Sequence, residues 1–236
     1  TPGQMALARM IAQGSTPAKA GITRVAASRY TDPDWFAREQ AALFAKLPQV
    51  IAPSALLPNP GMAVPHDGFG RPLLLTRDST GKAHVFHNVC RHRGTRLVEG
   101  SDAVCANRLV CPYHAWTYGL DGALRHVPGE DGFPGLDKDT HGLVPVQVHE
   151  KGGIVFVTQE APLSDGALAD SPLANGPDLL PPDWVLFNKL EFDDPANWKL
   201  IGETSMEGYH IKALHNQSFF PYGYDNLNVV ELHGRN

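Results

Sequence analysis

Four side chains of the types that bind soft metals occur as two short pairs. Cys90 and His92 are separated by one residue, and Cys111 and His114 are separated by two residues. Cysteine thiolates and imidazoles are preferred ligands of zinc and of iron–sulfur clusters. The spacing therefore predicts a metal centre held by two loops, each of which supplies one thiolate and one imidazole.

The order of the ligands separates these two kinds of centre. Zinc fingers usually keep cysteine with cysteine and histidine with histidine. In a Rieske 2Fe-2S cluster one iron is held by two cysteines and the other by two histidines, so each loop must reach both irons. Cys90, His92, Cys111 and His114 are therefore expected to bind a Rieske cluster, with a structural zinc site as the less favoured alternative.

A second group of potential ligands lies near the end of the sequence. If residues from about 198 toward 214 form one helix, Glu203, Glu207 and His210 stand at i, i+4 and i+7 and share a face. The solvated face of a surface helix has the same pattern. His215 would stand about 140° from His210 around an ideal helix, so both could meet one metal only if the helix bends or unwinds. Spacing alone leaves both interpretations open.

Both groups resemble one family. The segments CRHRG at 90–94 and CPYHAWTY at 111–118 look like the cluster loops of Rieske non-haem iron oxygenases, which comprise ring-hydroxylating dioxygenase α-subunits and related monooxygenases. The segment at 197–215 is similar to the iron-binding helix of that family. The resemblance implies an α+β fold, with an antiparallel β Rieske domain and the beginning of an α/β helix-grip catalytic domain. It also implies two cofactors, a Rieske 2Fe-2S cluster and a mononuclear non-haem Fe(II).

The resemblance assigns roles within the second group. By position, His210 and His215 match two ligands of a two-histidine, one-carboxylate triad, which leaves coordination positions open for dioxygen. Glu207 matches the acidic residue that links this iron to a Rieske histidine of a neighbouring subunit, and it would hydrogen-bond His210 of its own chain and His114 of another. The family's third ligand comes from further along the chain. It is expected beyond Asn236, and the sequence is interpreted as lacking its C-terminal part.

The third cysteine distinguishes two classes of Rieske protein. Respiratory Rieske proteins carry an additional cysteine in each loop, and these two form a disulfide. Here Cys105 precedes the second loop, and it is expected to be a buried strand residue. The resemblance is therefore to the oxygenase class. Trp116 and Tyr118 are expected to pack around the cluster and limit its access to solvent, and packing in the protein core would explain them equally well.

Short strands and tight turns are expected to position the two loops. Between about residues 48 and 160, short apolar runs alternate with Gly, Pro and Asp-Gly, and Leu120-Asp121-Gly122-Ala123 predicts a hairpin turn. A short surface helix is expected at residues 5–11, and an amphipathic helix is expected at residues 32–46. A further strand is expected at residues 184–192.

A change of composition indicates where the domains meet. Residues 161–183 are rich in Pro, Ala, Asp and Gly and are expected to connect two domains. The expected organisation is an N-terminal helical segment at 1–47, a Rieske 2Fe-2S domain at 48–160 and the N-terminal part of the catalytic iron domain at 161–236.

Composition argues against two classes of function. Twenty Lys and Arg against 25 Asp and Glu give a formal net charge of −5, with no basic block to follow a phosphate backbone, so nucleic acid is not an expected partner. The longest apolar runs are strand-sized, far below the roughly 20 residues that span a bilayer. Three cysteines are too few for a disulfide framework, and a cytoplasmic location is expected.

The expected activity follows from the resemblance. Electrons from a reductase or ferredoxin would enter the Rieske cluster and pass through Glu207 to the mononuclear iron, where dioxygen is activated. The substrate is expected to be a small organic molecule, with an aromatic one favoured, that is hydroxylated or oxidatively demethylated. Glutamate rather than aspartate at 207 resembles the branch that acts on choline-like and betaine-like amines. A homotrimer or other ring-shaped oligomer is expected. The alternative functions are those of a Rieske ferredoxin-like electron carrier and of a binding protein stabilised by zinc.

Overall fold

The computed structural model of the 236-residue chain describes residues 1–14, 23–160, 180–223 and 227. The chain divides into two compact units. The sheet unit spans Ala41–Lys189, and the helical unit combines Thr1–Gln40 with Leu190–Asn236. The N-terminal segment therefore groups with the end of the sequence. The domain boundaries expected from the sequence stay a prediction, and most of the expected connector at 161–183 lies outside the described residues.

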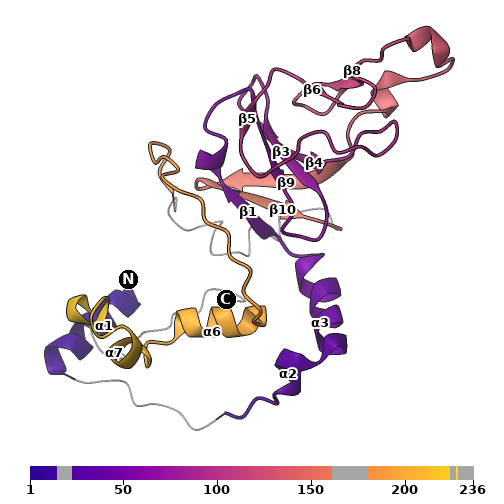
Figure 1. Cartoon of the computed structure of the whole chain (residues 1–236). Helices are drawn as coiled ribbons and strands as arrows, with labels where there is room; N and C mark the ends of the chain where they lie inside the picture. Colours follow the sequence, from indigo (N-terminus) through magenta and orange to yellow (C-terminus); the bar gives the residue numbers. More distant parts are fainter. Residues whose placement is uncertain (15–22, 161–179, 224–226, 228–236) are drawn as a thin grey trace. The chain divides into compact units, whose positions relative to one another are not determined.

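A seven-stranded antiparallel sheet forms the body of the sheet unit (Figure 1). Its order in space is β1-β10-β9-β4-β3-β2-β5. The bounds are β1 (Gln49–Pro53), β2 (Met62–His66), β3 (Leu73–Arg77), β4 (Ala83–His87), β5 (Val104–Cys105), β9 (Pro145–Lys151) and β10 (Ile154–Thr158). The strand-rich character expected for this region is confirmed.

A second sheet of three short strands carries part of the metal-binding sequence. It consists of β6 (Leu109–Val110), β7 (Thr117–Tyr118) and β8 (Leu124–His126). The predicted hairpin turn joins β7 to β8, and the N–H of Gly119 donates to the carbonyl of Ala123 at 2.9 Å. Gly122 has φ 82°, and a Cβ there would lie 2.4 Å from the Phe86 ring, so only glycine fits. Beyond β8, short 3-10 turns at Glu130–Gly132 and Lys138–Thr140 belong to a projecting segment (Figure 1).

Alternating side chains divide the core of the sheet unit into two clusters. Leu74 and Phe86 point to one face of the large sheet and pack in the same cluster as Cys90 and Cys111. Leu73 and Leu75, together with Val85, belong to the cluster on the opposite face. The cysteines of both loops are thus part of one apolar core. The hydroxyl of Thr76, which is buried, donates to the carbonyl of Leu120 at 2.6 Å and joins the two sheets.

The helical unit contains short helices. They are α1 (Pro2–Gln13), α2 (Ser28–Thr31), α3 (Pro33–Glu39), α6 (Trp198–Met206) and α7 (Ile211–Leu214). The helices predicted at 5–11 and 32–46 are confirmed, and the second ends in a π-helical turn at Gln40–Phe44. Asp32 caps α3 by accepting from the N–H of Asp34 at 2.9 Å. No helix among the described residues is long and apolar enough to cross a membrane.

Three expectations from the sequence are wrong. The helix expected from 198 toward 214 is interrupted, because Glu207 has extended backbone angles (φ −107°, ψ 139°) and its carboxylate accepts from the N–H of Tyr209 at 2.8 Å. This side-chain bond competes with the helical ladder. Residues 184–192 form no strand, and none of the described strands pairs with them. Cys105 does lie on a strand, but β5 is an edge strand and the thiol is exposed.

Candidate metal centres

The two cysteine loops have the same main-chain structure. The N–H of Cys90 donates to the carbonyl of Thr95, and the N–H of Gly94 donates back to the carbonyl of Cys90 (2.8 and 2.9 Å). Cys111 makes the equivalent bonds with Trp116 and Ala115 (2.9 and 3.0 Å). In each loop the residue four positions after the cysteine has a left-handed conformation. One local fold is therefore used twice to present the two pairs of candidate ligands.

The four candidate ligands differ in their burial. Cys90 and Cys111 are buried in the core, whereas His114 is exposed and His92 is partly buried. The ring centres of His92 and His114 lie 4.7 Å apart. Two imidazoles bound at neighbouring positions of one metal, with bonds of about 2.1 Å, place their ring centres about 4.5–5 Å apart. The arrangement fits a thiolate-bound iron inside the protein and an imidazole-bound iron near its surface.

The polar atoms of this site also fit a metal centre. Nδ1 of His92 is buried and has no hydrogen-bond partner among the described residues, as expected of a nitrogen reserved for a metal. Burial lowers the pKa of His92, and the neighbouring His114 and Arg93 lower it further. The ring is therefore held neutral, which is the form that binds metals. Burial raises the pKa of the Cys90 thiol, so its thiolate form needs a cation beside it.

Tyr118 contacts the first cysteine directly. Its hydroxyl lies 3.3 Å from Sγ of Cys90 and accepts from the N–H of Arg91 at 3.1 Å. Burial and the hydrogen bond to Cys90 raise the pKa of Tyr118, so the phenol stays protonated. Hydrogen bonds to cluster sulfurs help to set the reduction potential. The expected packing of Tyr118 beside this site is observed.

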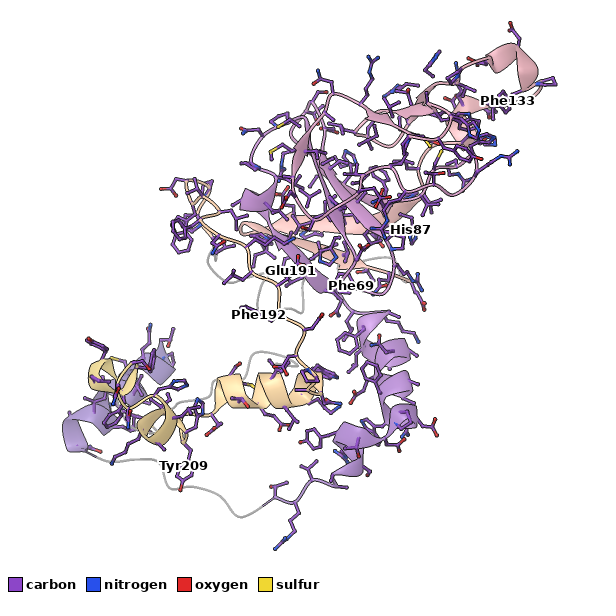
Figure 2. The ribbon with its side chains drawn as sticks, viewed as in Figure 1. Phe69, His87, Phe133, Glu191, Phe192 and Tyr209 are labelled. Atoms are coloured by element: carbon purple, nitrogen blue, oxygen red, sulfur yellow. The ribbon has the colours of Figure 1, made fainter. Side chains whose placement is uncertain are left out.

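Two aromatic rings enclose His92. Trp116 stacks on the imidazole, with ring centres 5.0 Å apart and planes 6° apart. The expected packing of Trp116 beside this site is therefore observed. Phe133, in the segment that projects beyond β8 (Figure 2), contacts the rings of His92 and Trp116 edge-on, with its ring centre 5.9 and 5.7 Å from theirs. Sequence reasoning missed Phe133, because it lies 41 positions after His92 and only the fold brings them together.

Asn88 is a second residue that sequence reasoning missed. Its side chain is completely buried, and Oδ1 accepts from the N–H groups of Leu97 and Val98 at 3.0 and 3.2 Å. Nδ2 donates to the carbonyl of Val98 at 2.8 Å. These three bonds close the ends of the loop that carries Cys90 and His92. The available signal was an asparagine two positions before the first candidate ligand, at the end of an expected strand.

The arrangement of donors separates a cluster from a zinc site. No three Cys, His, Asp or Glu side chains of the described residues converge on a single metal position. Tetrahedral zinc needs four donors at about 2.0–2.3 Å from one ion. In a Rieske cluster each iron takes only two protein ligands, so pairs of donors suffice. The geometry therefore favours the cluster over the zinc alternative.

The second group of predicted ligands lies at the interruption between α6 and α7. His210 precedes α7 and His215 follows it, and their ring centres are 5.3 Å apart. Oε1 of Glu207 lies 2.6 Å from Nδ1 of His210, and this bond lowers the pKa of Glu207. Because this bond occupies Nδ1, Nε2 is the nitrogen of His210 that could bind a metal, as in the usual carboxylate–histidine–metal arrangement. Glu203 does not join this group, because it accepts from the hydroxyl of Tyr30 at 2.9 Å.

Comparison with known families decides the relationship. Residues 48–147 match the Rieske [2Fe-2S] domain, and residues 181–236 match the catalytic domain of the ring hydroxylating alpha subunit. The chain belongs to the Rieske oxygenase α-subunit family. Members of this family carry a Rieske 2Fe-2S cluster and a mononuclear iron, and the α+β fold expected from the sequence is confirmed.

Relatives of this Rieske oxygenase chain include enzymes named for quaternary ammonium compounds. The chain is 36% identical to the glycine betaine monooxygenase oxygenase subunit of Chromohalobacter salexigens, over 79% of this chain and 42% of the relative. It is 32% identical to the carnitine monooxygenase oxygenase subunit of Escherichia coli K12, over 79% and 50% of the two chains. A crystal structure of a quaternary ammonium Rieske monooxygenase with gamma-butyrobetaine superimposes with a TM-score of 0.71 and 30% identity, over 80% and 55%. The chain thus spans about half the length of these relatives.

Proposed function

We propose that this protein is the oxygenase component of a monooxygenase that acts on a small quaternary ammonium compound. The observation that carries this proposal is the arrangement of Glu207, His210 and His215 in a chain that also contains the two cysteine loops. An iron bound at these residues would use the electrons that a cluster in the loops delivers. The names of the relatives support the substrate class. They give no support to the aromatic substrate favoured from the sequence.

The proposed reaction balances with two external electrons. One atom of dioxygen enters a C–H bond of the substrate, and the other leaves as water after taking up two electrons and two protons. When the inserted oxygen lies on an N-methyl carbon, loss of that carbon as formaldehyde completes a demethylation. The electrons come from a separate reductase or ferredoxin, which is the partner proposed for this chain.

The chain's own residues have distinct proposed roles. Cys90, His92, Cys111 and His114 would hold the cluster, and His210 and His215 would hold the mononuclear iron, which activates dioxygen when bound. Glu207 fixes the orientation of His210 through the bond to Nδ1 and would connect to His114 of a neighbouring subunit in a ring-shaped oligomer. We also assign the protein to the cytoplasm, in keeping with three free thiols.

A Rieske ferredoxin-like carrier is the second candidate. Such a carrier needs the twin loops and has no use for the Glu207 and His210 pair. The match of residues 181–236 to a catalytic domain favours the oxygenase.

Substitution of His210 tests the proposal in the full-length protein with its reductase. Glycine betaine, carnitine, choline and naphthalene would be compared by oxygen uptake and product formation. We expect turnover of a quaternary ammonium compound by the wild type, and none by His210→Ala, whose Rieske EPR signal should persist. His126→Ala, which changes an exposed histidine outside both sites, should behave as the wild type. Unchanged turnover in His210→Ala would refute the iron assignment, and turnover of naphthalene alone would refute the substrate class.

A further inference from the structure

The carboxylate of Glu39, at the end of α3, contacts the beginning of α6. Nζ of Lys199 donates to both carboxylate oxygens at 2.8 Å, and Nε1 of Trp198 donates to Oε2 at 3.0 Å. Nε1 of Trp35, one turn earlier on α3, donates to Oε1 at 2.8 Å. Each oxygen therefore accepts from one charged and one neutral donor, and the three donor residues lie on two helices.

The side chains of Trp35, Glu39, Trp198 and Lys199 together form a hydrogen-bonded node, which is enclosed by the helices that carry it. Glu39 exposes 8% of its surface, and the side chains of Lys199 and Glu39 expose 17% and 10%. The ammonium group of Lys199 also lies over the rings of Tyr30 and Trp198, at 5.6 and 5.2 Å from their centres. Charge-assisted bonds in such surroundings depend strongly on geometry, so the node fixes both the position and the rotation of α6.

Two further contacts extend along the same helix. Nδ2 of Asn197 donates to the carbonyl of Tyr30 at 3.0 Å, while its Oδ1 caps α6 by accepting from the N–H of Lys199 at 3.1 Å. One helical turn later, the hydroxyl of Tyr30 donates to Glu203 at 2.9 Å. The consecutive residues Asn197, Trp198 and Lys199 thus each contact the α2–α3 segment.

The helix that is held in this way leads directly to the iron-binding turn. Along an α-helix, Lys199 lies about 12 Å from Glu207, and Glu203 is one turn before it. A rigid element only nine residues long transmits a rotation at its start to the residues at its end. The iron ligands follow within eight residues of Glu207.

We propose that Glu39 is a positioning residue for the mononuclear iron, which acts through Trp198 and Lys199 to set the orientation of α6 and thereby of Glu207 and His210. The inference rests on the proposed iron site. It also gives the Asn-Trp-Lys sequence a role in docking the helix, apart from any contact with metal or substrate.

The test uses the full-length protein with its cluster loaded. Fe(II) binding would be titrated, and the EPR spectrum of the Fe(II)–nitric oxide adduct would report the ligand geometry. We expect Glu39→Gln to weaken Fe(II) binding on the order of tenfold and to change the adduct spectrum, as for residues that orient a metal ligand. The Rieske EPR signal should not change. Asp34→Asn removes one carboxylate from the same helix outside the node, and it should leave all three measurements unchanged.

A double-mutant cycle separates positioning from general stability. Because Glu39 and Lys199 form one node, the double variant with Glu39→Gln and Lys199→Met should lose no more Fe(II) affinity than the worse single variant. If Glu39→Gln fails to fold, Trp198→Phe removes one hydrogen bond and keeps an aromatic ring, and it should still shift the adduct spectrum.

The possible results are distinguishable. A lower melting temperature with wild-type Fe(II) affinity and adduct spectrum, in Glu39→Gln or in Trp198→Phe, would overturn the inference. His210→Ala should abolish the adduct signal. Its persistence there would refute the iron site itself, whereas its loss there together with an unchanged signal in Glu39→Gln would refute only the role of Glu39.

Discussion

Gly94 and Ala115 occupy equivalent positions in the two cysteine loops but differ in side chain. Their φ angles are 73° and 57°, both in the left-handed region. An L-residue there costs roughly 1–2 kcal/mol relative to the right-handed region. A Cβ on Gly94 would meet only Cγ1 of Val89, at 3.9 Å, so crowding adds no further cost. The second loop therefore bears a backbone strain that the first loop avoids.

Opposite substitutions at these positions should have unequal effects. We expect Gly94→Ala to lower the free energy of unfolding by about 1 kcal/mol, because it introduces the strain that Ala115 already has. Ala115→Gly should be close to neutral, since relief of strain is offset by the larger entropy of glycine in the unfolded chain. Denaturant unfolding monitored by tryptophan fluorescence would measure both. Equal losses for the two variants would contradict this account of the loops.

The metal-binding residues illustrate what sequence can predict at this scale. Each pair of cluster ligands lies within four consecutive positions, so its spacing is visible without a fold. Asn88 closes the first loop through bonds to residues nine and ten positions away, and Phe133, which contacts His92, lies 41 positions after it in the sequence. Those contacts depend on tertiary structure, which is why the spacing of residues did not reveal them.

At the scale of elements, one buried arginine ties three parts of the sheet unit together. Arg77 at the end of β3 makes two bonds to Glu150 on β9, at 2.7 and 3.0 Å, across the intervening strand β4. It also donates to the carbonyls of Leu57 and Gly81. The bond from Arg77 lowers the pKa of Glu150, and burial opposes this effect.

Glu150→Gln should therefore destabilise the protein in a pH-dependent way. A carboxylate whose pKa is lowered by folding stabilises the folded state fully above its unfolded-state pKa of about 4.3. This stabilisation is lost as the pH falls through the folded-state pKa. We expect a loss of about 2 kcal/mol in the free energy of unfolding at pH 7, shrinking below about pH 4. Glu160→Gln breaks an exposed pair with Arg71 and should cost under about 0.5 kcal/mol. A Glu150→Gln deficit that persists unchanged at pH 3 would contradict the argument.

Helices and strands were predicted where their causes are local. The β7–β8 turn follows from Asp121-Gly122, and α3 follows from the Asp32 cap and Pro33. The interruption after α6 depends on a carboxylate that turns back onto Tyr209 and His210, which helical periodicity does not reveal. A strand also needs a neighbour for its hydrogen bonds, and residues 184–192 have none among the described strands.

At the scale of the whole molecule, the two proposed metal sites lie in different units of the chain. The family assignment and the α+β class were predictable because the cluster loops and the iron-binding segment each have a distinctive sequence. The grouping of the N-terminal helices with the iron-binding segment was not, since it depends on contacts such as Glu39 with Lys199, 160 positions apart.

Mixed oligomers would test whether electrons pass between subunits. Under the proposed function, His114→Ala disables the cluster and His210→Ala disables the iron, so each variant alone should be inactive. Oligomers that contain both variants should regain turnover, because an intact cluster on one subunit can serve an intact iron on its neighbour. Co-expression with two affinity tags and purification through both would isolate these oligomers. Absence of turnover in verified mixed oligomers would contradict electron transfer between subunits.

The repeated main-chain pattern at Cys90 and Cys111 bears on how the holoprotein is made. Each loop is held by its own amide-to-carbonyl bonds, and the first is also closed by Asn88. Because these bonds are made within the polypeptide, we expect the two loops to keep their shape when the cluster is removed. Cluster insertion can follow folding as a separate maturation step, and chelation should yield a folded apoprotein that accepts a cluster again.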